Sequence, residues 1–124
     1  MRASSAIVKR ARPLLGTLVE ISVQGRGANE AIDCAFAAVE RVHHAMSRQE
    51  STSDIARLRA GHRAALDPWT RRVLDRAEEI RLATDGLFDC ESCDYSLDGI
   101  AKGFAVDRAV DGLRDAGITA GVVN

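Results

Sequence analysis

The residues best suited to chemistry lie near the end of the chain, in a run with two glycines, a lysine and two aspartates. The run reads Leu97-Asp98-Gly99-Ile100-Ala101-Lys102-Gly103-Phe104-Ala105-Val106-Asp107. Gly99 and Gly103 would let a ligand approach the backbone closely. The start of a helix offers unpaired N–H groups and the positive end of a dipole, and Lys102 adds a positive charge. This spacing predicts a cradle for a phosphate or pyrophosphate group. The alternative is a glycine-rich turn with a solvated lysine.

Three further segments precede this run. They are Leu15-Gly16-Thr17, the stretch 47–58 with the sequence Ser-Arg-Gln-Glu-Ser-Thr-Ser-Asp-Ile-Ala-Arg-Leu, and Thr84-Asp85-Gly86-Leu87-Phe88-Asp89. Together the four segments resemble the motifs of the FAD:protein FMN transferase family, also called the ApbE family. The family pattern reads M-G-T, L-S-x-x-x-x-x-S-[DE]-[IL]-x-x-L-N, T-x-G-x-F-D and D-L-x-G-I-A-K-G-[YF]-A-V-D. The resemblance spans residues 13–124.

The resemblance implies that FAD is a substrate and that part of its cradle lies in this chain. The implied FAD contacts are Leu15, Leu87, Phe88, Asp89, Ser96, Asp98 and Lys102. Leu15 would be an apolar wall, where the family usually has Met. A family metal contact, with magnesium as the metal, falls at Gly99, which could offer only its backbone carbonyl. No catalytic residue is implied within this chain.

The chain departs from the family pattern at several positions. Arg59 stands where the family has Asn, and Ser96 stands where the family has an FAD-contacting Asp. Asp98, two residues later, would lie on the same face of a strand and could replace it. Only residues 90–96 separate the Phe-Asp motif from the Gly-Lys motif, against several dozen residues in the family. The sequence stops at Asn124, before the family's G-G-D, H-x-x-[DN]-P and A-D-A-x-A-T segments, which supply the catalytic histidine and most metal ligands.

The resemblance implies transfer of the FMN half of FAD to a threonine hydroxyl of a target flavoprotein, with release of AMP. Such a transfer at a pyrophosphate needs charge neutralisation by a metal, a positioned hydroxyl and a base. We therefore expect the N-terminal part of a magnesium-dependent FMN transferase, inactive alone and completed by a companion chain or a missing C-terminal half. One alternative is a non-catalytic module that binds a flavin nucleotide or a partner chain. Another is a structural α/β module without a ligand.

Hydrophobic periodicity predicts one strand, four helices and a final β-prone run. The strand covers 14–23, the helices cover 29–46, a short segment after Ser53, 68–83 and 100–116, and the β-prone run covers 118–123. Ser53 and Asp67 are the expected helix caps, and Gly61, Gly86 and Gly117 the expected helix ends. In the helix 68–83, the side chains expected to face inward are Trp69, Val73, Ala77, Ile80 and Leu82.

These elements predict the fold class and the domain organisation. We expect an α/β chain that forms a partial ApbE-like α+β domain over 13–124, with helices packed on a small mixed sheet. A sheet of two or three strands is too small to cover four helices, so a missing half or a second chain would complete it. Residues 1–12 are expected to be a flexible N-terminal segment.

Composition excludes several classes of partner. The net charge is −1, and acidic and basic residues are mixed along the chain, so no basic face for nucleic acid is expected. No stretch approaches the ~18 apolar residues of a membrane-spanning helix. Residues 1–12 lack the hydrophobic core of a signal peptide, and no lipobox cysteine follows an apolar segment. We therefore expect a cytoplasmic protein, although members of the family are often membrane-anchored lipoproteins.

The cysteines and histidines could in principle hold a metal. Cys34 stands alone, and the odd number of cysteines fits a reducing compartment. Cys90 and Cys93 have the spacing of half a zinc site, which needs further ligands. The remaining candidates, His43 and His44, are neighbours on a helix and should point in different directions. The favoured interpretation is two loop thiols without a metal, and His43 packed in the core.

Overall fold

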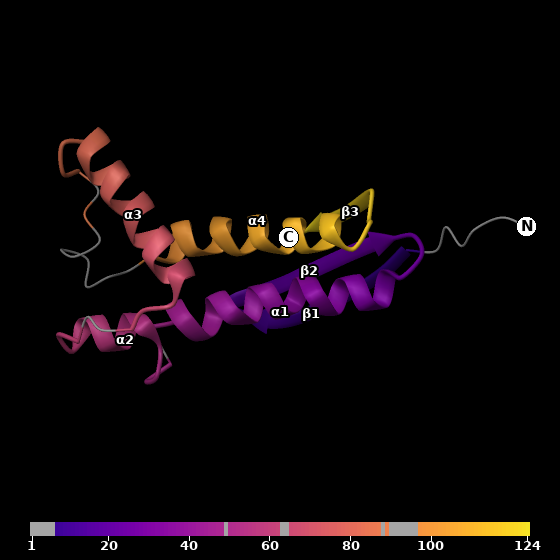
Figure 1. Cartoon of the computed structure of the whole chain (residues 1–124), viewed down its shortest axis with the longest axis horizontal. Coiled ribbons are helices and arrows are strands. Elements are labelled where there is room, and N and C mark those ends of the chain that lie inside the picture. The colour runs from indigo at the N-terminus through magenta and orange to yellow at the C-terminus, as the bar shows by residue number, and fades with distance from the viewer. Residues whose placement is uncertain (1–6, 49, 63–64, 88, 90–96) are drawn as a thin grey trace, which may run out of the picture. The chain divides into compact units, whose positions relative to one another are not determined.

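The structure is a computed structural model that describes residues 7–48, 50–62, 65–87, 89 and 97–124, without the side chain of residue 98. The elements in order are β1 (Ile7–Leu14), β2 (Thr17–Gln24), α1 (Ala28–Met46), α2 (Asp54–Arg59), α3 (Pro68–Ala83), α4 (Asp98–Asp115) and β3 (Ala120–Val123) (Figure 1). They form two compact units, Met1–Arg41 with Ala105–Asn124, and Val42–Phe104. We describe each unit by itself.

The first unit is built on a three-stranded sheet in the order β1-β2-β3. Both pairings are antiparallel, with Arg10 opposite Ile21 and Gly121 opposite Val23. The described sheet is therefore antiparallel throughout, whereas we expected a mixed sheet. Helices and antiparallel strands are segregated along the chain, which is the pattern of an α+β fold, as expected.

A hairpin explains the main difference from the sequence analysis. Leu15 and Gly16 form a two-residue loop with φ values of 57° and 72°, and Leu14 pairs with Thr17 across it. The expected strand 14–23 is thus interrupted by a turn, and residues 7–12 of the expected flexible segment belong to β1. The sequence signal was weak because β1 is rich in basic residues and its turn lacks the usual Asn-Gly or Asp-Gly pair.

One face of the sheet is covered by α1 and the C-terminal part of α4. The strand residues Val19, Ile21 and Val23 are at most 5% exposed and face these helices. A Cβ added at Gly112 of α4 would lie 3.9 Å from the backbone nitrogen of Ala35 in α1, so the two helices pack closely. The buried residues of α1 in this unit are Ala28, Ala31, Ile32, Ala35, Phe36 and Val39. Their three- and four-residue spacing is the one that predicted this helix.

Charged side chains of β1 connect the sheet to α1. Arg10 donates hydrogen bonds of 2.7 Å to both Asp33 and Asn29, and Arg12 donates one of 2.7 Å to Glu40. The Arg12 guanidinium also lies 4.6 Å from the centre of the Phe36 ring. Basic residues made β1 hard to predict from the sequence. In the structure, two of them, Arg10 and Arg12, attach β1 to α1.

The second unit contains the end of α1, then α2 and α3, and the start of α4. Ser53 caps α2, because its hydroxyl accepts the N–H of Ala56 at 3.0 Å. Asp67 caps α3 by accepting the N–H of Trp69 at 2.8 Å, and Pro68 is the first helical residue. Both caps confirm the sequence prediction. Trp69 packs edge to face against Phe104 at 5.7 Å between ring centres.

Three helices end at the glycines that the sequence predicted. Gly61, Gly86 and Gly117 have φ values of 86°, 83° and 84°, the left-handed conformation that glycine adopts without strain. In α3, however, Leu82 is 62% exposed, so the expectation that it faces inward was wrong. Leu82 lies nine residues after the buried Val73, which is two and a half helical turns and therefore the opposite face.

Candidate functional site

The first two turns of α4 contain the residues of the predicted phosphate cradle. Leu97 occupies the N-cap position: it is 2% exposed, and its carbonyl accepts the N–H of Ala101 at 2.7 Å. A leucine side chain cannot accept a hydrogen bond, unlike the caps Ser53 and Asp67 of α2 and α3. The first N–H groups of α4 therefore receive no hydrogen bond from the side chain of Leu97.

The glycines of this turn are not explained by packing within the described part of the chain. Both Gly99 and Gly103 lie within α4 and are exposed, and a Cβ added at either would meet nothing within 4 Å. A helical glycine costs about 0.5–1 kcal/mol relative to alanine. The exposed Lys102 lies between them, and among the described residues no carboxylate is paired with it. Among the described residues nothing covers the two glycines, and Lys102 places a positive charge between them.

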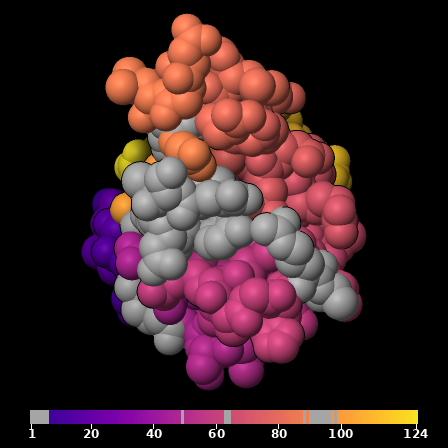
Figure 2. All heavy atoms as spheres, turned by 90° about the vertical axis from the view of Figure 1, so that its left-hand side faces the viewer, coloured from indigo at the N-terminus to yellow at the C-terminus, as the bar shows by residue number. Residues whose placement is uncertain are grey.

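The second predicted contact segment follows α3. Asp85 and Gly86 have φ values of 51° and 83°, and the N–H of Gly86 donates to the carbonyl of Arg81 at 2.8 Å. This tight helix end leaves Leu87 91% exposed, while Asp89 is half-buried. Figure 2 shows the surface of the second unit from the side of α2 and α3, with the end of α3 and its turn at the top of the view. An apolar side chain so exposed is available to a ligand or a partner.

The structure does not collect all the predicted residues in one unit. Leu87, Asp89, Gly99 and Lys102 belong to the second unit, as does the backbone of Asp98. Leu15 belongs to the first unit, where it is half-buried in the β1–β2 turn with a positive φ that is uncommon for leucine. The predicted contacts Phe88 and Ser96, like Cys90 and Cys93, lie outside the described residues.

The Ser-Asp pair of the second motif has a structural role in this chain. Asp54 is 3% exposed, and its carboxylate accepts the N–H of Asp67 at 2.9 Å and the hydroxyl of Thr70 at 2.5 Å. It also accepts a hydrogen bond from Arg57. The carboxylate thus ties the start of α2 to the start of α3. This explains the motif without a ligand.

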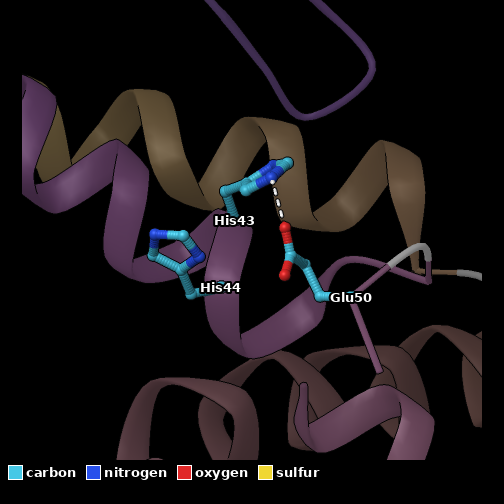
Figure 3. Close-up of side chains that lie close together, drawn as sticks. All are labelled: His43, His44 and Glu50. Atoms are coloured by element: carbon cyan, nitrogen blue, oxygen red, sulfur yellow. Dashed lines mark ion pairs between the residues drawn. The ribbon is translucent and has the colours of Figure 1, made fainter. Parts of the chain in front are cut away.

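A cluster that the sequence did not predict lies in the second unit. His43, His44 and Glu50 each have a ligand atom within 4.8 Å of the others (Figure 3). We expected the two histidines to diverge, and expected His43 in the core. Instead, His43 is half-buried and its Nε2 lies 3.5 Å from a carboxylate oxygen of Glu50. The sequence feature that could have predicted this cluster is Glu50, which follows shortly after a helix with two histidines in its last turn.

Within the described residues, none of the helices combines the length and the apolar character needed to cross a membrane.

Comparison with known proteins gives two findings. A sequence model of the ApbE family matches residues 15–95. Among solved structures, the chain is similar to the flavin transferase ApbE from Vibrio cholerae, with a TM-score of 0.81 and 17% sequence identity. The match covers 96% of this chain and 57% of that structure, so the chain spans little more than half of its length. No curated protein sequence matches significantly.

Proposed function

Because the chain belongs to the ApbE family, we propose that it provides part of the FAD cradle of an FMN transferase. The complete activity would move the FMN half of FAD to a threonine hydroxyl of a target flavoprotein and release AMP. The match of 57% of the Vibrio cholerae structure supports a chain that acts as a part of a larger assembly. A companion chain or further residues would supply the catalytic histidine of the family.

The observation that supports the proposal is the structure of the first two turns of α4. Its N-cap is the apolar Leu97, its two glycines leave the surface open, and Lys102 is exposed beside them. Free N–H groups at a helix start, together with a positive side chain, favour a pyrophosphate. A glycine-rich turn with a solvated lysine would need neither an apolar cap nor glycines inside the helix, where alanine is more stable.

The chemistry of this chain is limited to binding and charge neutralisation. When FAD is bound, Lys102 and the N–H groups of α4 would neutralise the negative charge that increases as the pyrophosphate bond breaks. The exposed Leu87 would contact an apolar part of FAD. We assign the proton transfer from the threonine hydroxyl to a group outside this chain.

Magnesium dependence belongs to the same proposal, but Gly99 is not suited to hold the metal. Gly99 has no side chain, and it lies in α4, where its carbonyl is the regular acceptor for the N–H of Gly103. Magnesium prefers carboxylate, water and phosphate oxygens in an octahedral arrangement. No step of the proposed reaction therefore depends on a metal ion at Gly99.

Titration of FAD into the purified chain tests the proposal, with flavin fluorescence as the readout. We expect saturable binding that is weakened by competing ADP, because both ligands carry a pyrophosphate. Riboflavin, which lacks the phosphates, is the control and should bind more weakly than FAD. Equal binding of riboflavin and FAD, or no FAD binding, would contradict the proposed cradle. The second outcome would favour the structural α/β module.

A further inference from the structure

We propose that His43, His44 and Glu50 form a binding site for a divalent transition-metal ion, with Zn²⁺ as the best match. The three residues belong to the second unit, at the end of α1 and in the segment that follows it (Figure 3). Their ligand atoms lie within 4.8 Å of one another. The proposal does not depend on the proposed flavin chemistry.

The donor atoms select the class of metal. Two imidazole nitrogens and one carboxylate oxygen suit Zn²⁺, whereas Mg²⁺ and Ca²⁺ prefer oxygen ligands alone. Three protein ligands leave a fourth tetrahedral position for water or another ligand. The site therefore differs in kind from a magnesium site at a pyrophosphate.

The distances are close to those of a metal centre. Tetrahedral Zn²⁺ with bonds of about 2.0–2.1 Å separates neighbouring ligand atoms by about 3.4 Å. The Nε2 atom of His43 and the Oε1 atom of Glu50 are already 3.5 Å apart. His44 is exposed, and its ring lies 5.5 Å from that of His43 between centres. Rotation of this exposed side chain is the movement that the site requires.

The local backbone holds the ligands in place before an ion arrives. Ser53 is 1% exposed, its hydroxyl donates to the carbonyl of Ser47 at 2.7 Å, and its N–H donates to the carbonyl of Glu50 at 3.1 Å. The N–H of Ser47 donates to the carbonyl of His43 at 2.9 Å. Through Ser47 and Ser53, these bonds connect the last turn of α1 to the backbone of Glu50.

Electrostatics favour a cation at this position. His43 and His44 lie in the last turn of α1, where the negative end of the helix dipole stabilises positive charge. Glu50 adds a full negative charge beside them. A simple His43–Glu50 ion pair is the competing explanation, and it does not require His44.

Zn²⁺ titration of the whole chain, followed by calorimetry at neutral pH, tests the proposal. The three cysteines, Cys34, Cys90 and Cys93, are first replaced by serine so that thiolates cannot bind the ion. We expect one Zn²⁺ per chain and a higher melting temperature in its presence. Loss of a direct ligand in His44→Gln or Glu50→Gln should weaken binding at least about tenfold, since loss of a mere outer-shell partner already costs about 10–100-fold.

The controls separate this site from adventitious binding. His62 is exposed and is the remaining histidine of the chain, so His62→Gln should leave Zn²⁺ affinity unchanged. Circular dichroism confirms that the variants fold, which is expected because His44 is exposed and Glu50 half-buried. Absence of Zn²⁺ binding would overturn the proposal. Equal affinity in the cysteine-free protein and its His44→Gln and Glu50→Gln variants would also overturn it, as would loss of binding in His62→Gln.

Discussion

Lys102 lies exposed on α4 between two glycines whose Cβ positions are open, and this arrangement makes it the residue to test for FAD binding. A charge-assisted hydrogen bond is worth roughly 1.5–3 kcal/mol, and about 1.4 kcal/mol corresponds to a tenfold change in affinity. We therefore predict that Lys102→Ala weakens FAD binding about ten- to a hundredfold, as measured by flavin fluorescence. The free energy of unfolding should hardly change, because an exposed lysine near a helix start contributes little.

Lys9→Ala is the matched control for this change. Lys9 is the other lysine of the chain, and its exposed side chain lies 3.7 Å from Glu20 on β1 and β2. Its removal alters the net charge equally but should leave the dissociation constant for FAD unchanged. If both variants bind FAD as tightly as the wild type, Lys102 is a solvated lysine that does not contribute to FAD binding.

Asp54 differs from Lys102 because its carboxylate is buried and already accepts hydrogen bonds within the chain. Asp54→Ala would leave the Thr70 hydroxyl and the N–H of Asp67 without their acceptor. Each buried polar group left unsatisfied costs about 1–3 kcal/mol, so for two such groups we predict a loss of about 2–6 kcal/mol in the free energy of unfolding. Urea denaturation measures it. Asp75→Ala on the exposed face of α3 should cost little, and equal losses in both variants would contradict the buried role of Asp54.

At the scale of elements, α4 offers a comparison between two glycines in one helix. Gly103→Ala places a Cβ where nothing lies within 4 Å. It should raise the free energy of unfolding by about 0.5–1 kcal/mol, because alanine is the better helix former. FAD affinity should fall, since the methyl group occupies the surface that the pyrophosphate would approach. Thermal denaturation and FAD titration measure the two effects.

Gly112→Ala controls for the general effect of alanine in α4. Its Cβ would make ordinary contacts of 3.8–3.9 Å with the backbone of Cys34 and Ala35. We expect no change in FAD affinity from this substitution, because Gly112 packs against α1. A stabilised Gly103→Ala protein with wild-type FAD affinity would show that the glycine serves no ligand.

At the scale of the whole molecule, the sheet of the first unit has apolar residues exposed on one face. One face is covered by α1 and α4, but Ile7, Leu18 and Val122 on the strands are 67%, 56% and 54% exposed. Strand β3 pairs with β2 at one edge, and the described residues provide no strand for its other edge. Such apolar surface and such an open edge are typical of an interface.

We predict that the 124-residue chain does not transfer FMN by itself. Its sequence contains no H-x-x-[DN]-P motif, the segment that we expect to supply the catalytic histidine. An assay with FAD, magnesium and a threonine-bearing acceptor should yield no flavinylated product by mass spectrometry and no AMP. Metal-dependent transfer of FMN by this chain alone would refute the proposal that the catalytic histidine lies outside it. A complete ApbE-family transferase serves as the positive control.

The sequence by itself determined the local features of this protein. Ser53, Asp67 with Pro68, and the three terminal glycines predicted the helix boundaries, because a cap or a left-handed helix end depends on a few adjacent residues. The spacing of apolar residues predicted α1 for the same reason. The motif order also predicted the family that the later comparison confirmed.

Only the tertiary structure decided how distant or adjacent residues meet. β1 is a strand because it pairs along its whole length with β2, and Arg10 and Arg12 attach it to α1, which no local pattern of β1 reveals. The contact of Asp54 with Thr70 depends on how the chain returns between α2 and α3. His43 and His44 are neighbours on a helix, so their Cβ atoms point in different directions, and this is why we expected the two side chains to diverge. The length of their side chains and the position of Glu50 after the helix end brought the three ligand atoms together.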